Sequence, residues 1–199
     1  MILHKKLVTE IRYNDVTYYL KPYFNVVLSC FWIMKQIGID EESKIDLCLN
    51  HLGIENRFLK QLHFLDKAML FQKIMNLLID SKKSDTTNKK TFDFIQDAEY
   101  IYSAFFECYK IDLYEQFNKL HWQKFIALFK GLNDATRFMK IVAIRAQPIP
   151  KPNKYNGEEI ARLIASKQLY ALEISQEERE EQLAKGLNNL FDALTKAGD

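Results

Sequence analysis

The feature of this sequence that most constrains its fold is an aromatic-rich segment, residues 92–113, in which apolar side chains recur at steps of three and four. This spacing places them on one face of an α-helix. The chain as a whole holds 14 Phe and 10 Tyr but only 6 Gly and 4 Pro, which argues against an all-β protein with many tight turns. We therefore expect a mostly α fold, a helical bundle with aromatic packing in its core.

The first 80 residues predict a short β-hairpin followed by helices. In residues 7–20 the turn dipeptide Asn14-Asp15 separates two segments rich in β-branched and aromatic residues. Residues 23–37 predict a helix that is apolar nearly all round and must therefore be buried or covered by another copy of the chain. Phe31 and Trp32 on this helix are candidate partner-binding residues.

A further helix is expected within residues 56–80. Its apolar residues fall roughly along one face, with Lys67 and Lys73 outside that face. The residues assigned to the face are Leu62, Leu65, Met69, Ile74 and Leu78.

Composition divides the remainder of the chain. Residues 80–91 contain no apolar side chain, which predicts a solvated linker. The expected organisation is a hairpin and helical subdomain in 1–80, a polar linker in 81–91, a helical subdomain in 92–147, and a proline-rich arm with C-terminal helices in 148–199. Prolines at 148, 150 and 152 favour an extended arm, because proline removes backbone donors and restricts the residue before it.

The C-terminal residues offer a second candidate binding surface. Leucines there keep helical steps of four, three and four, after a Ser175 to Glu178 capping-box pattern. They are Leu183, Leu187, Leu190 and Leu194. This amphipathic stripe either docks on its own domain or fills a groove on a partner helix, and the sequence leaves both open.

His121 and Trp122 lie side by side and raise the question of an active site. Asp112 and Glu115 fit a capping box that opens a helix ending near Gly131, with Phe117 among its inward residues. The local acids are thus explained as cap residues, and the aromatic residues as core. The core anchors we expect are Tyr102, Phe105, Trp122, Phe125 and Phe129.

The sequence contains little evidence for a metal site, a catalytic motif, a membrane span or a nucleic-acid-binding surface. The three cysteines, Cys30, Cys48 and Cys108, form no Cys-x-x-Cys pair and no zinc-like spacing with the histidines, so buried reduced thiols are expected. No phosphate loop, nucleophile motif or apolar span of membrane length occurs. The net charge of +2 argues against nucleic-acid binding. We expect no enzyme activity, no metal, no cofactor and a cytoplasmic protein.

Two stretches carry a resemblance to a known family: "FDFIQDAEYIYSAFFECYKIDL" and "LHWQKFIALFKGLNDATRFMKIVAIRAQPIPKPNKY". From residue 13 to about residue 172 the chain resembles the phage gene-product-fifteen family of siphophage tail-assembly proteins. The matching positions include Asp97, the turn from Tyr109 to Leu113, Ile144-Arg145 and the prolines of the arm. Lys110 stands where the family turn often has glycine.

The resemblance implies a tail-assembly chaperone of a long-tailed phage or prophage, acting in the host cytoplasm. Its implied partners are the tape-measure protein and the major tail protein, with self-association into a homo-oligomer. Exposed apolar grooves and repeated copies would suit that role. The alternative is a structural tail or neck component that remains in the virion.

Overall fold

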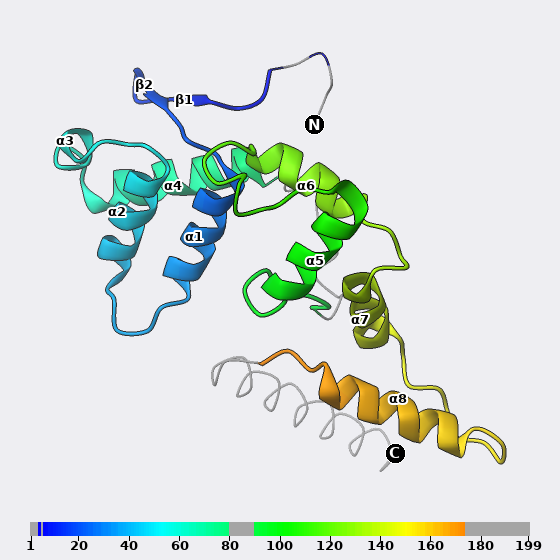
Figure 1. Ribbon diagram of the computed structural model, residues 1–199. Coiled ribbons are helices and arrows are strands. Elements are labelled where there is room, and N and C mark those ends of the chain that lie inside the picture. The colour runs from blue at the N-terminus through cyan, green and yellow to red at the C-terminus, as the bar shows by residue number, and fades with distance from the viewer. Residues whose placement is uncertain (1–3, 5, 80–89, 174–199) are drawn as a thin grey trace, which may run out of the picture. The chain divides into compact units, whose positions relative to one another are not determined.

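The computed structural model describes residues 4, 6–79 and 90–173 (Figure 1). These residues form one two-stranded sheet and eight helices, which confirms a mostly α fold with an N-terminal hairpin. The elements are β1 (Glu10–Tyr13), β2 (Val16–Tyr19), α1 (Phe24–Met34), α2 (Glu41–His51), α3 (Asn56–Leu59), α4 (Phe64–Leu78), α5 (Ala98–Tyr109), α6 (Trp122–Lys130), α7 (Arg137–Ala146) and α8 (Gly157–Leu169). The chain divides into two compact units, Met1–Ala146 and Gln147–Asp199, each described by itself.

The predicted hairpin is present, with antiparallel β1 and β2 joined by Asn14 and Asp15. Both turn residues are left-handed, with φ of 46° and 60°, as a two-residue turn that matches the twist of the strands requires. Asn and Asp tolerate this geometry better than most side chains. Ile11, Tyr13 and Tyr18 on one face of the hairpin are buried.

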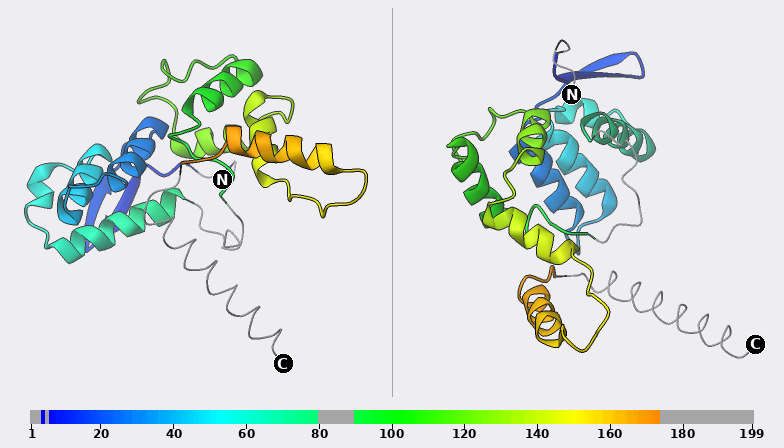
Figure 2. Two further views of the ribbon diagram at one scale, coloured as in Figure 1. Left: turned by 90° about the horizontal axis from the view of Figure 1, so that it is seen from below. Right: turned by 90° about the vertical axis from the view of Figure 1, so that its right-hand side faces the viewer.

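Helices α1 and α2 run side by side (Figures 1 and 2). Val27, Cys30, Cys48 and Leu49 between them are fully buried. Both thiols are free and buried, as expected, whereas Cys108 is only partly buried. Helix α2 begins after Asp40, whose Oδ1 accepts the N–H of Ser43 at 2.9 Å and so satisfies a backbone donor of the first turn.

The predicted inward face of α4 is partly wrong. Leu65 and Met69 are 69% and 51% exposed, while Ile74 and Leu78 are buried as expected. Lys67, expected outside, is buried on the same face as Leu70, Ile74 and Leu78. Its ammonium donates to the carboxylates of α2 that face it, which offsets the cost of burying the charge. These are Glu42 at 3.0 Å and Asp46 at 2.9 Å.

The prediction that a helix begins at Asp112 is also wrong. Asp112 Oδ1 accepts the N–H of Tyr114 at 2.9 Å within an irregular turn, and α6 begins only at Trp122. Asn118 has φ of 57°, a left-handed geometry that cannot be part of an α-helix. Lys110, in the position where the family turn often has glycine, is likewise left-handed at 55° and ends α5.

The linker and the C-terminal segment fall largely outside the described residues. Residues 80–89 of the predicted linker and residues 174–199, which include the leucine stripe, are not described. Residues 148–153 form neither helix nor strand, and the extended geometry of the arm stays a prediction. In the second unit, α8 begins at Gly157.

Candidate protein-interaction surface

His121 is the N-cap of α6 and belongs to the packing of the protein. Its Nδ1 accepts the N–H of Gln123 at 3.0 Å, and its Nε2 lies 2.7 Å from the carbonyl oxygen of Val8. Nε2 therefore carries the ring hydrogen and donates a hydrogen bond to the carbonyl oxygen of Val8. Both ring nitrogens are engaged and the residue is buried, so the ring ties the chain before β1 to α6 instead of facing a substrate.

Backbone hydrogen bonds join the regions on the two sides of the predicted linker. Trp122 N–H donates to the carbonyl of Pro22 at 2.7 Å, and Phe24 N–H donates to that of Leu120 at 3.0 Å. This short antiparallel bridge holds the first turn of α1 against the first turn of α6. The two predicted subdomains are thus parts of one compact unit.

Between these helices lies a set of rings that we name the inner aromatic cluster. Neighbouring ring centroids are 5.0 to 6.5 Å apart, the range in which aromatic pairs attract. The cluster comprises Phe31, Phe94, Trp122, Phe125 and Phe129. Phe105 of α5 stacks on Phe125 at 5.0 Å. Trp122, Phe125 and Phe105 are buried, and Phe129 is half-buried.

A buried ion pair joins the chain just before α5 to the end of α7. The guanidinium of Arg145 donates two hydrogen bonds to the Asp97 carboxylate, at 2.7 and 2.8 Å, and a third to the carbonyl of Thr91 at 3.1 Å. The Asp97 side chain is 1% exposed, so this bidentate contact is what makes its burial tolerable. Asp97 and Arg145 are both positions on which the family resemblance rests, and the structure brings them together.

Asp93 forms a second charged junction beside it. Lys35 and Lys90 contact its Oδ2 at 2.6 and 2.7 Å, and the N–H groups of Ile95 and Gln96 donate to Oδ1. Burial by itself would raise the pKa of the Asp93 carboxyl, but these two ammonium groups and the backbone donors outweigh it and hold the pKa well below its ordinary value.

The predicted partner-binding residues of α1 have different surroundings. The ring of Phe31 packs on Trp122 at 5.7 Å and is half-buried. Trp32 is 52% exposed, and Ile37 and Ile39 in the loop after α1 are also exposed. A partner contact at Trp32 stays a prediction. Leu183, Leu187, Leu190 and Leu194 lie outside the described residues.

Helix α4 carries an exposed apolar face at its N-terminal end, which we name the α4 face. It consists of Phe64, Leu65 and Met69, which are 45%, 69% and 51% exposed. Leu65 and Met69 are one helical turn apart and so lie next to each other. Sequence periodicity placed both on one face with Ile74 and Leu78, which are buried, and this error concealed the surface.

A second exposed surface consists of four rings that we name the aromatic ladder. Tyr102 and Phe106 of α5 continue into Tyr114 and Phe117 of the turn after it, with successive centroids 5.5 to 6.4 Å apart. Phe106, Tyr114 and Phe117 are 49%, 72% and 46% exposed. Tyr102, expected as a core anchor, is partly buried against the core and also contacts Phe106 and Tyr114 of this ladder. Phe117, expected inward, is exposed and packs edge-to-face on Phe24.

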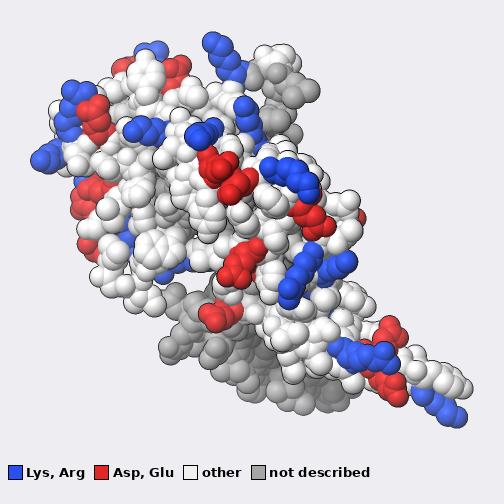
Figure 3. All heavy atoms as spheres, viewed as in Figure 1, with Lys and Arg blue, Asp and Glu red and all other residues white. Residues whose placement is uncertain are grey.

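Charge is mixed on the face of the molecule shown in Figure 3. On the face shown in Figure 3, basic and acidic side chains of the described residues alternate. Within the described ranges, no group of three or more His, Cys, Asp or Glu is arranged to hold a metal ion. None of the helices in those same ranges is long and apolar enough to cross a membrane.

Comparison with known families decides the broad identity of the chain. A family model described as Bacteriophage Gp15 protein matches residues 3–172. The chain belongs to this family. Gp15 proteins are phage structural or assembly proteins, and the match spans all ten helices and strands of the described residues. No curated protein and no solved structure matched the chain.

Proposed function

We propose that this Gp15-family protein is a tail-assembly chaperone. It acts in the host cytoplasm, binds the tape-measure protein and tail-tube subunits during tail morphogenesis, and self-associates. Beyond family membership, the observation that carries the proposal is the α4 face, where Phe64, Leu65 and Met69 present apolar side chains to solvent. A helix face of this kind suits an amphipathic partner helix, whose own apolar residues recur at steps of three and four.

Burial of apolar area supplies the binding energy in this mechanism. Each Å² removed from water contributes roughly 25 cal/mol before the cost of association is subtracted. One face of this size gives weak binding. Many copies arranged along one long client helix add avidity without any new kind of contact, which is why self-association forms part of the proposal.

Co-expression with the tape-measure protein of the same phage tests the proposal. Pull-down through a tag on this chain is expected to recover soluble tape-measure protein. The double variant Leu65→Ser/Met69→Ser is expected to lose most of it. The matched control is Tyr155→Ser, since Tyr155 is 91% exposed and belongs to the second unit instead of α4. Equal recovery by the double variant and the control would show that the α4 face is not the client surface.

The alternative role makes a different observable prediction. A structural tail or neck component remains in purified phage particles at a fixed copy number, whereas a chaperone leaves. Quantitative mass spectrometry of purified particles separates the two. Detection of this chain at a constant ratio to the major tail protein, together with failure of the pull-down, would replace the chaperone proposal by the structural one.

A further inference from the structure

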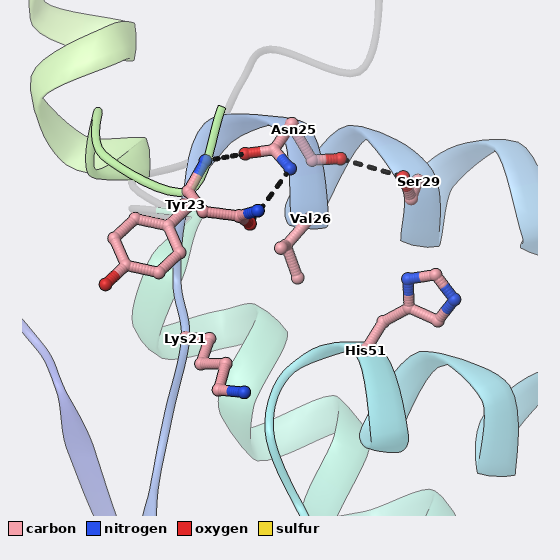
Figure 4. Close-up of a pocket in the computed structure, with 7 residues that line it drawn as sticks. Lys21, Tyr23, Asn25, Val26, Ser29 and His51 are labelled. Carbon is pink, nitrogen blue, oxygen red and sulfur yellow. Dashed lines mark hydrogen bonds between the residues drawn. The ribbon is translucent and has the colours of Figure 1, made fainter. Parts of the chain in front are cut away.

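A surface pocket of about 610 Å³ opens beside the first turn of α1 (Figure 4). It is lined by Lys21, Tyr23, Asn25, Val26, Ser29, His51 and Asn118. Lys21 and His51 lie on the side of α1 to which Val26 points, whereas the ring of Tyr23 turns away from them. The lining contains two basic side chains and no acidic one, and its volume is in the range of ligand-binding pockets.

The position of Lys21 is fixed by its backbone and its stem. Its N–H donates to the carbonyl of Leu52 at 2.7 Å, and its Cγ lies 3.1 Å from where a Cβ on Gly53 would be. Gly53 also has φ of 101°, a geometry that favours glycine. Any larger residue there would press on the lysine stem, so glycine allows α2 to end close against Lys21.

The opposite wall of the pocket is a reciprocal amide pair. Asn118 N–H donates to Asn25 Oδ1 at 3.0 Å, and Asn25 Nδ2 donates to Asn118 Oδ1 at 3.2 Å. The Nδ2 group of Asn118 and one hydrogen of Asn25 Nδ2 remain available as donors. Within the described part of the chain, neither the Lys21 ammonium nor the His51 ring has a hydrogen-bond or ionic partner. An excess of donors selects a ligand rich in acceptors, such as a carboxylate.

The pocket adjoins the aromatic ladder. Asn118 follows Phe117 directly, and the two side chains contact consecutive residues of α1: Phe117 packs on Phe24 at 5.7 Å and Asn118 pairs with Asn25. The carboxylates of Asp112 and Glu115 act on Tyr102 in the middle of the ladder, and at its far end the Lys110 ammonium lies 5.9 Å from the centroid of the Phe106 ring. A ligand that follows this surface therefore meets basic donors at the pocket, and then exposed rings flanked by the carboxylates of Asp112 and Glu115.

We propose that the pocket and the ladder form one docking surface for a partner polypeptide whose sequence places carboxylate side chains next to apolar ones. The carboxylates occupy the pocket beside Lys21 and His51, and the apolar side chains cover Phe117, Tyr114 and Phe106. The carboxylates of Asp112 and Glu115 repel acidic side chains from the middle of the ladder, so that the carboxylates of the partner are favoured in the pocket. A nucleic acid fits less well, because its phosphates would continue past the pocket toward Asp112 and Glu115.

The test is peptide binding to the purified full chain, which does not depend on the chaperone role. The probe is a fluorescein-labelled synthetic peptide with paired glutamates at one end and leucines at every third or fourth position, followed by fluorescence anisotropy. We expect saturable binding, about tenfold weaker for Lys21→Gln/His51→Gln. Tyr114→Ser is expected to weaken it by a similar factor. The matched controls, Lys140→Gln on α7 and Tyr155→Ser in the second unit, change exposed residues that line neither the pocket nor the ladder and are expected to bind like the parent chain.

Four results would overturn the proposal. They are absence of binding to the parent chain, equal binding by the pocket variant, equal binding by a peptide in which glutamines replace the glutamates, and equal loss in the controls. Two further measurements, a competition with succinate and direct binding of an oligonucleotide, identify other classes of ligand. Displacement of the peptide by free succinate at comparable concentration would make the pocket a small-carboxylate site. Tighter binding of a labelled oligonucleotide than of the peptide would make the surface a nucleic-acid site.

Discussion

The inner aromatic cluster and the aromatic ladder are built from the same kind of residue at nearly the same spacing. Ring centroids are 5.0 to 6.5 Å apart in the cluster and 5.5 to 6.4 Å apart in the ladder. The two differ in exposure: Phe125 is 1% exposed and Tyr114 is 72% exposed. Helices α1 and α6 enclose the cluster, whereas Phe106, Tyr114 and Phe117 of the ladder are exposed.

This difference shows that aromatic periodicity does not distinguish a core from a binding surface. Phe105 and Phe106 are neighbours on α5, yet Phe105 stacks on Phe125 of α6 and Phe106 is half exposed on the ladder. Whether a ring belongs to the inner aromatic cluster or to the aromatic ladder depends on which helix, distant in the sequence, packs over it. Substitutions in the two regions are therefore expected to separate stability from binding.

The largest loss of stability is expected for Phe125→Ala. Phe125 stacks on Phe24, Phe105 and Trp122 at 5.0 to 5.5 Å, and its removal leaves a cavity that the surrounding helices fill only in part. The free energy of unfolding, measured by urea denaturation, is expected to fall by about 3–5 kcal/mol. Phe125→Leu should lose less. A loss of under about 1 kcal/mol for the alanine variant would mean that the cluster is not the core.

Arg145→Leu is expected to cost nearly as much. It leaves the Asp97 carboxylate buried without its counter-ion, which destabilises the fold by about 3 kcal/mol. The matched control is Arg162→Leu, because the pair of Arg162 with Glu158 is 80% and 91% exposed and should change stability by under about 1 kcal/mol. Thermal denaturation of both variants measures the contrast. Equal losses of stability in the two variants would contradict the role of Arg145 as the counter-ion of the buried Asp97 carboxylate.

His121→Ala is expected to lose about 1–2 kcal/mol, since it removes the cap of α6 and the hydrogen bond to Val8. His121→Asn retains a cap acceptor and is expected to recover part of the loss. Urea denaturation measures both. If His121→Ala were fully stable but failed to support phage assembly, His121 would instead act in function.

Acid is expected to weaken the junction at Asp93. Because the folded-state pKa of this carboxyl lies below its unfolded value, its stabilising contribution is present above about pH 4 and is lost as pH falls toward the folded pKa. Asp93→Asn should therefore be less stable than the parent chain at neutral pH, and the difference should shrink in acid. Urea denaturation over a series of pH values measures it. A difference independent of pH would contradict the assignment.

The smallest change in stability is expected on the ladder. Tyr114→Ser alters a largely exposed ring and should change the free energy of unfolding by under about 0.5 kcal/mol, while weakening peptide binding. Urea denaturation and anisotropy of the same preparation check both expectations. A stability loss of about 2 kcal/mol or more would place Tyr114 with the core instead of the docking surface.

The sequence predicted the elements whose signals are local. Asn14-Asp15 gave the hairpin turn because few residue pairs adopt two consecutive left-handed conformations. The aromatic period within residues 92–113 likewise predicted a helix, which the structure shows as α5. In each case the residues involved lie within a few positions of one another, so the chain itself determines the geometry.

The sequence-based predictions were wrong where contacts between residues far apart in the sequence determine the structure. Periodicity allowed two faces for α4, and the face with Lys67 is buried because Glu42 and Asp46 of α2 pair with its ammonium. A capping pattern at Asp112 was local and plausible, but α6 begins at Trp122, after the N-cap His121, whose ring is oriented by Val8, far away in the sequence. The ladder and the pocket depend in the same way on Phe117 and Asn118 meeting α1.

The most direct test of the proposed role is the mass of the complex formed with the tape-measure protein, measured by light scattering after co-expression and purification. The account predicts a soluble complex with many copies of this chain for each tape-measure chain, and a lower copy number for Leu65→Ser/Met69→Ser. A tape-measure protein that precipitates while this chain remains alone, or a complex with a single bound copy, would contradict it.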